Sequence, residues 1–159
     1  MISIIFLLLT AILAAGTILI KKKRGIADIL ETITLWAIVV NVGLGCLFAF
    51  TGHAFMADQV AARIGWQPGS PFQLEVAAAN LAFGILGLCS LRFRGDFWLA
   101  TAIGFALFLL GAACVHIRGI VMKGNLAEYN AGAFLVMGDV VVPIAILVLV
   151  IVHRRLSLK

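Results

Sequence analysis

The fold is decided by residues 52–75, GHAFMADQVAARIGWQPGSPFQLE, the longest run in this chain that a bilayer core would not accept. Apolar stretches flank it on both sides, and about 20 apolar residues in helical form cross the hydrocarbon layer. The run also carries His53, Asp58, Trp66 and Glu75. It is therefore predicted to connect two transmembrane helices and to contribute polar residues to any functional site.

The composition indicates a membrane protein along the whole chain. Hydrophobic residues make up 64% of the 159 residues and charged residues 12%, whereas an ordinary globular domain has roughly 45–50% and about 25%. A water-soluble chain of this length could not bury so much apolar surface. We expect an all-α, polytopic transmembrane helical bundle that forms a single domain over residues 1–159, with the lipid bilayer as its partner.

Five apolar segments are long enough to be spans, and one amphipathic segment is expected to lie at the membrane interface. Residues 54–64 alternate Phe55, Val60 and Ile64 with polar residues, as an interfacial helix does. Ser70 and Gln73 have the spacing of a capping box for the third span. Pro143 is expected to kink the fifth span. The predicted spans are residues 2–20, 30–51, 71–91, 97–117 and 131–152, and the interfacial helix is 54–64.

The basic residues predict how these spans are oriented. The chain has 12 Lys and Arg against 7 Asp and Glu, but the positive charges lie at the ends of apolar runs and form no basic, aromatic-rich patch for nucleic acid. Loops rich in Lys and Arg stay cytoplasmic. An N-terminus outside and a C-terminus in the cytoplasm put nine basic residues inside and three outside. The inner ones are Lys21, Lys22, Lys23, Arg24, Arg92, Arg94, Arg154, Arg155 and Lys159, and the outer ones Arg63, Arg118 and Lys123.

With this orientation, polar residues from four spans fall in the outer half of the membrane. Ionisable groups inside a membrane are costly and usually face the bundle interior or a cavity. Asp139, about two turns into the fifth span, is the strongest single candidate, and a structural hydrogen bond to Asn80 or His116 is the alternative reading. The candidates for ligand binding or a proton relay are His53, Glu75, Asn80, His116, Asn130 and Asp139.

Two histidines and two carboxylates could hold a metal ion if they converge. His53, His116, Glu75 and Asp139 are a ligand set that suits zinc or iron. A haem between His53 and His116 is a weaker alternative. No HExxH, CxxC or ExxH pair supports either cofactor, and helix-locking hydrogen bonds would explain the same residues.

Several separated pieces of the sequence resemble a bacterial family of small, uncharacterised multi-span membrane proteins. They are GHAF, IGW and SPFQLE within 52–75, NLAFG at 80–84, VHI at 115–117, and the N-A-G, D and P of 130–143. The resemblance covers roughly residues 50–150 and implies no established activity. It implies that His53, Glu75, His116, Asn130 and Asp139 belong together.

The leading functional prediction is a protein of the bacterial inner membrane whose periplasm-facing polar pocket binds a small ligand or a metal ion. A transporter or proton-relay subunit is the first alternative, although few polar residues continue through the inner half beyond Asn41 and Thr101. An accessory or structural subunit of a larger membrane complex is the second. A homo-oligomer is compatible with each, and no motif assigns an enzymatic reaction.

Overall fold

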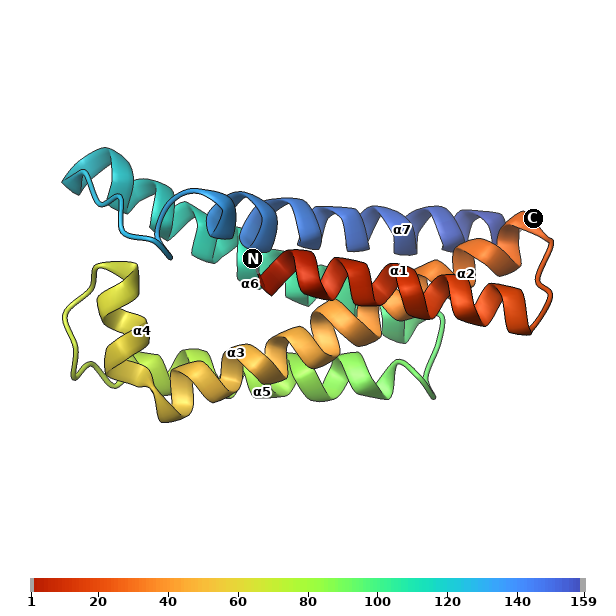
Figure 1. Cartoon of the computed structure of the whole chain (residues 1–159), viewed down its shortest axis with the longest axis horizontal. Helices are drawn as coiled ribbons and strands as arrows, with labels where there is room; N and C mark the ends of the chain where they lie inside the picture. Colours follow the sequence, from red (N-terminus) through yellow and green to blue (C-terminus); the bar gives the residue numbers. More distant parts are fainter. Residues whose placement is uncertain (1, 158–159) are drawn as a thin grey trace.

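The computed structural model describes residues 2–157, and every regular element in that part of the chain is helical. In chain order these are α1 (Ile2–Ile20), α2 (Ile26–Ala37), η1 (Ile38–Leu44), α3 (Gly45–Phe55), α4 (Ala57–Ile64), α5 (Phe72–Cys89), α6 (Asp96–Lys123), η2 (Phe134–Val141) and α7 (Val142–Ser157). The two η segments are π-helical, and they continue directly into the neighbouring α-helices. The long helices run side by side along one axis (Figure 1).

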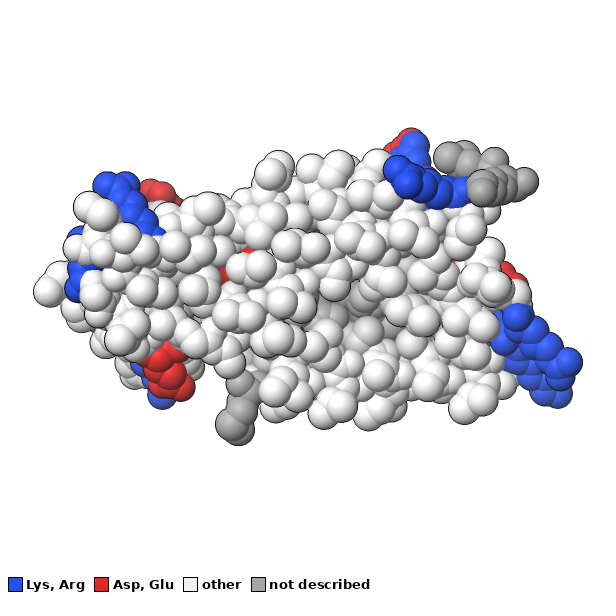
Figure 2. Space-filling view, turned by 90° about the horizontal axis from the view of Figure 1, so that it is seen from above, with Lys and Arg blue, Asp and Glu red and all other residues white. Residues whose placement is uncertain are grey.

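Five of these helices are long and apolar enough to cross a membrane, which fits a multi-span membrane protein. They correspond one to one with the predicted spans, and α4 corresponds to the predicted interfacial helix. In Figure 2 the charged side chains gather at the two ends of the molecule, with an almost uncharged belt between them. We call the end that carries Lys21–Arg24 and Arg92 the basic end, and the end that carries α4 the α4 end. Lys159, part of the predicted inner set, lies outside the described residues.

The largest difference from the predicted boundaries concerns α6. This helix continues to Lys123 rather than stopping at 117, and its 28 residues extend about 42 Å, more than the hydrocarbon thickness of about 30 Å. His116 therefore lies about two turns before the helix end instead of at it. The chain after Gly124 has to fold back along α6 to reach the next span, and this return segment forms part of the candidate site.

The continuous helix α2–η1–α3 is the centre of the bundle. Half of its apolar window is buried, against 11% for α1. It crosses α5 where two glycines meet: a Cβ atom added to Gly87 would lie 2.3 Å from the backbone nitrogen of Gly43. One turn away, a Cβ atom on Gly84 would lie 2.8 Å from the side chain of Leu47. Small residues allow helix backbones in a membrane to approach this closely.

The first helix is attached to this centre by two side-chain hydrogen bonds. The amide of Asn41, in η1, donates to the hydroxyl of Thr10 at 2.9 Å, and the indole of Trp36 donates to the hydroxyl of Thr17 at 2.9 Å. Each threonine hydroxyl in turn donates to a carbonyl four residues earlier in α1. Asn41, a candidate from sequence for a polar path through the bundle, therefore holds α1.

The remaining core lies between α2–η1–α3, α6 and α7. Trp98 is fully buried near the basic end, and its indole donates to the carbonyl of Ser90 at 3.0 Å. Phe105 and Ile146 continue the same apolar cluster toward the middle of the bundle. Because α6 and α7 pack together along this cluster, they bring the C-terminal part of α6 beside η2.

The predicted capping box at the start of α5 is not formed as expected. The hydroxyl of Ser70 accepts a hydrogen bond from the backbone of Phe72 at 3.3 Å, in a short local turn. The side chain of Gln73 bonds instead to His53 at 2.7 Å. Because Gln73 is buried, a hydrogen bond to His53 on the neighbouring helix stabilises the fold more than a bond to the partly hydrated helix end would.

The glycine crossing predicts a position-specific loss of stability. In Gly87→Ala the new methyl group meets the backbone of Gly43, so we expect the free energy of unfolding to fall by about 1–3 kcal/mol, as overpacked cores do. Gly111→Ala is the matched control, because nothing lies within 4 Å of a Cβ atom there and alanine favours helices. Thermal unfolding in detergent measures both variants. Equal stability of the two would contradict a close backbone contact.

Candidate functional site

The structure brings together three of the six candidate residues: His116 of α6, Asn130 of the segment before η2, and Asp139 of η2. All three are buried. Trp66, from the loop between α4 and α5, completes the group, because its indole stacks on the imidazole of His116 at 5.8 Å between ring centroids and 19° between planes. The site lies at the α4 end of the bundle, and three segments far apart in sequence form it.

Asn130 is the centre of this cluster and has no exposed surface. Its side-chain oxygen lies 2.9 Å from Nδ1 of His116. Its side-chain nitrogen donates to the carbonyl of His116 at 3.3 Å and to the carbonyl of Asn125 at 2.8 Å. One buried amide therefore joins the return segment to α6, and both of its polar atoms have partners.

These contacts define which ring nitrogen of His116 carries a hydrogen. The Asn130 nitrogen faces two carbonyl oxygens, which can only accept, so the other amide atom, facing the imidazole, has to be the oxygen acceptor. The Nδ1 of His116 must then be the donor. In the neutral ring, Nε2 is left with a lone pair.

Nε2 of His116 faces the carboxylate of Asp139, and the two groups lie just beyond hydrogen-bond distance. The separation between Nε2 and Oδ2 is 3.7 Å, and both side chains are more than nine-tenths buried. Oδ2 has no hydrogen-bond partner among the described residues. Because hydrogen bonds of this type measure about 2.7–3.2 Å, a shift of less than about 1 Å would close the pair. An unneutralised carboxylate here would be costly, since buried charges need partners.

The connection over the site is ordered by contacts between two loops. Asn125 donates from its side chain to the carbonyl of Ile64 at 2.8 Å. Arg63 donates to the hydroxyl of Tyr129 at 2.6 Å, and the backbone of Tyr129 donates back to the carbonyl of Arg63 at 3.1 Å. These bonds join α4 to the return segment and hold Trp66 against His116. Part of the 52–75 connection thus packs against the return segment and covers one face of His116.

The other three candidates do not join this cluster. His53 bonds to Gln73 on α5, Glu75 is exposed, and the amide of Asn80 donates to the carbonyl of Val76 in its own helix at 2.9 Å. Their side chains are turned toward other partners or toward the surface rather than toward Asp139. Rotation about each helix axis, which decides this, could not be read from the sequence.

The predicted four-ligand metal site is therefore not assembled. Among the described residues, no group of three or more His, Cys, Asp or Glu side chains could hold a metal ion. A haem between His53 and His116 is also disfavoured. Nδ1 of His116 bonds to Asn130, Nε2 faces Asp139, and Trp66 covers one ring face.

Two contributors to the site, Trp66 and Asn125, were missed as functional candidates from sequence. Trp66 lies within residues 52–75, but aromatic residues are common in interfacial loops without any role in a functional site. Asn125 carried no signal that separated it from other loop asparagines. Both act through tertiary contacts, Trp66 with His116 of α6 and Asn125 with Ile64 of α4.

Comparison with known proteins identifies the family. A model described as a family of unknown function, DUF6790, matches residues 1–159, so the chain belongs to that family. The match includes the first span and its basic end, so it extends beyond the residues 50–150 on which the sequence resemblance rests. No curated protein and no solved structure matches the chain.

The tautomer of His116 is a direct test of the site. Nitrogen NMR of isotope-labelled histidine distinguishes protonated from bare ring nitrogens, and the His116 signal is assigned with His116→Gln. We expect Nδ1 to carry a hydrogen in the wild type and to lose this preference in Asn130→Ala. Asn80→Ala, which removes a bond within α5 only, should leave the signal unchanged. A bare Nδ1 in the wild type would contradict the assigned hydrogen bond.

Proposed function

We propose that this DUF6790 protein is a membrane-embedded proton-binding module, in which His116 and Asp139 share one proton. The observation that supports this most strongly is the buried Oδ2 of Asp139 without a hydrogen-bond partner, opposite a ring nitrogen that has a lone pair. One proton bound at either atom converts the gap into a hydrogen bond, as Asp–OH to neutral imidazole or as carboxylate to imidazolium. The module would serve as a proton relay or as the proton-coupled part of a transporter.

A proton suits this pair better than a metal ion does. Zinc sites use three or four protein ligands, and the third polar neighbour here, Asn130, already uses its oxygen on His116 and its nitrogen on two carbonyls. A proton needs only two atoms and little space. It also removes the charge imbalance that an ionised carboxylate would create in the membrane.

The π-helical turns provide a second supporting observation. Asp139 lies within η2, and Asn41 lies within η1. Such turns are rare and recur at functional sites. Pro143 has no N–H to donate to the carbonyl of residue 139, which favours a departure from regular α-helix here. A widened turn gives Asp139 room to move toward or away from His116, and a relay group needs that movement.

The orientation is part of the proposal. The excess of Lys and Arg at the basic end favours a cytoplasmic location for that end, with the α4 end outside, in a bacterial inner membrane. The His116–Asp139 pair would then exchange protons with the outer side, past Trp66.

Vibrational spectroscopy tests the proton site directly. On acidification from about pH 8 to 5, a range that brackets the pKa of a free histidine side chain, we expect infrared difference bands of Asp139 that are absent in Asp139→Asn. Glu75→Gln is the control, because Glu75 is exposed and separate, and the Asp139 bands should persist in it. His116→Gln should move the pH at which they appear. Identical difference spectra of Asp139→Asn and the wild type would refute a titrating site.

Proton movement across the membrane is measured separately. In liposomes that contain a pH indicator and carry an imposed potential, we expect the wild type to conduct protons about tenfold or more faster than Asp139→Asn, because a positioned proton acceptor accelerates transfer at least this much. Glu75→Gln should match the wild type. Titration of the pair without any flux would restrict it to proton binding rather than relay.

Impermeant thiol labelling in intact cells checks the orientation. After replacement of Cys46, Cys89 and Cys114, we expect a cysteine at Gln67, in the exposed loop before α5, to react from outside. A cysteine at Ile26, exposed at the basic end, should react only after the membrane is opened. Labelling of position 26 in intact cells would reverse the orientation.

A further inference from the structure

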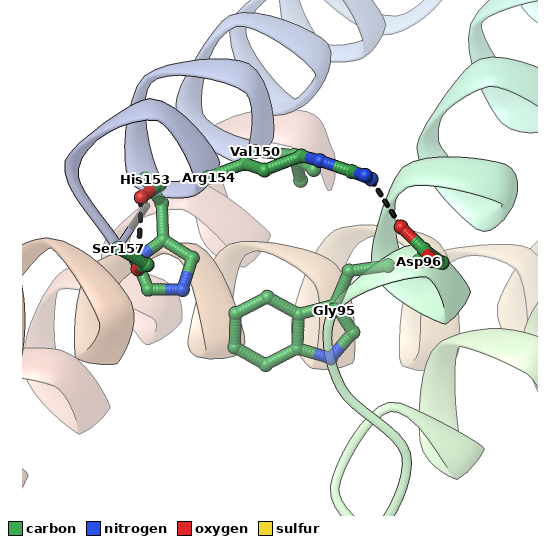
Figure 3. A pocket seen from close by; sticks show the side chains of 7 residues that line it. Gly95, Asp96, Val150, His153, Arg154 and Ser157 are labelled. Atoms are coloured by element: carbon green, nitrogen blue, oxygen red, sulfur yellow. Dashed lines mark hydrogen bonds and ion pairs between the residues drawn. The ribbon is translucent and has the colours of Figure 1, made fainter. Parts of the chain in front are cut away.

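A cavity of about 310 Å³ lies at the basic end, far from the His116–Asp139 pair. It opens between the start of α6 and the end of α7. Figure 3 shows Gly95 and Asp96 on one side and His153, Arg154 and Ser157 on the other, with Arg154 reaching across the opening toward Asp96. Trp98, fully buried, closes the apolar side.

The surroundings of the cavity carry strong positive charge. Eight basic residues of the described chain belong to this end, against three acidic ones. The basic residues are Lys21, Lys22, Lys23, Arg24, Arg92, Arg94, Arg154 and Arg155, and the acidic ones are Asp28, Glu31 and Asp96. Lys23 and Arg94 both pair with Glu31, at 3.7 and 3.4 Å. The net positive charge draws anions to this end.

Within the cavity, the available groups suit an anion. Arg154 forms an ion pair with Asp96, and the Asp96 side chain is 86% exposed. Exposed ion pairs contribute only about 0–1 kcal/mol to stability. An incoming anion can therefore compete with Asp96 for the guanidinium of Arg154. Nδ1 of His153 is buried without a hydrogen-bond partner among the described residues. The N-terminus of the 28-residue α6 adds partial positive charge and has no side-chain cap at Gly95.

The helix that supplies most of these polar groups also has exposed apolar side chains, which favours a lipid over a soluble anion. Val152 and Leu156 are 42% and 38% exposed on α7, the helix that contributes His153, Arg154 and Ser157 to the cavity. An acyl chain can lie on such a surface while its phosphate enters the cavity. Basic cavities between membrane helices bind anionic head groups in this manner.

We infer that this cavity binds the phosphate head group of an anionic phospholipid. Arg154 exchanges its partner from Asp96 to the phosphate, and His153 donates a second hydrogen bond. The inference is independent of the proton site, since the two lie at opposite ends of the bundle and use different residues.

Native mass spectrometry of the full chain, released from neutral detergent with added lipid, tests this binding. The three probes are phosphatidylglycerol, phosphatidylcholine with the same acyl chains, and inorganic phosphate alone. We expect the wild type to retain phosphatidylglycerol in preference to both others. Arg154→Gln should bind it about tenfold more weakly, the effect of losing one charge-assisted hydrogen bond.

A variant of opposite sign separates binding from folding. Asp96→Asn removes the carboxylate that competes for Arg154, so we expect tighter phosphatidylglycerol binding than in the wild type. Arg118→Gln, an exposed arginine of α6 near the α4 end, is the charge-matched control and should bind as the wild type does. Thermal unfolding in phosphatidylcholine verifies that each variant is folded.

The other outcomes each overturn the inference. Equal lipid binding by Arg154→Gln and the wild type would exclude the cavity as the site. An equal loss in Arg118→Gln would indicate general charge attraction. Weaker binding by Asp96→Asn would mean that the ion pair itself is required. Inorganic phosphate bound as tightly as phosphatidylglycerol would assign the cavity to a soluble anion instead.

Discussion

The backbone contact between Gly43 and Gly87 is the constraint on which the arrangement of the bundle depends. In a membrane, lipid tails are as apolar as the side chains, so helices associate through close packing and hydrogen bonds rather than through the hydrophobic effect. The two glycines bring η1 and α5 together where a Cβ atom on Gly87 would lie 2.3 Å from Gly43. This crossing sets α5 against η1 and α3.

Hydrogen bonds from polar side chains attach α1 and the return segment, which the packing of the glycines does not contact. Asn41 and Trp36 attach the peripheral α1 through the hydroxyls of Thr10 and Thr17. Asn130 does the same for the return segment, with one buried amide that contacts three groups. In low dielectric each unpaired group would cost more than it does in water. A fully satisfied asparagine can therefore hold a loop in one conformation and orient an imidazole at the same time.

The two polar sites of the molecule differ in burial and in net charge. The His116–Asp139 pair is closed, buried and nearly neutral when it shares a proton, which suits a group that exchanges protons only. The basic-end cavity is open, positively charged and beside apolar surface, which suits an anionic lipid. A proton module whose opposite end holds a lipid would be anchored at that end in its bilayer while the buried pair titrates.

The sequence by itself determined the five long apolar helices and the polar break between the second and the third. Nineteen apolar residues followed by four basic ones, and a Gly- and Pro-containing break at 65–69, leave little choice in a bilayer, because the thickness of the hydrocarbon dictates helix length. Only the tertiary structure decided that Asp139 meets His116 while Glu75 faces outward and His53 turns to Gln73. Helix rotation depends on packing, here of α6 against α7 for His116 and Asp139 and of α5 against α3 for His53 and Gln73. The end of α6 at Lys123 coincides with a local signal, Gly124 in the left-handed conformation, whereas the return of Asn130 to His116 arises from tertiary contacts.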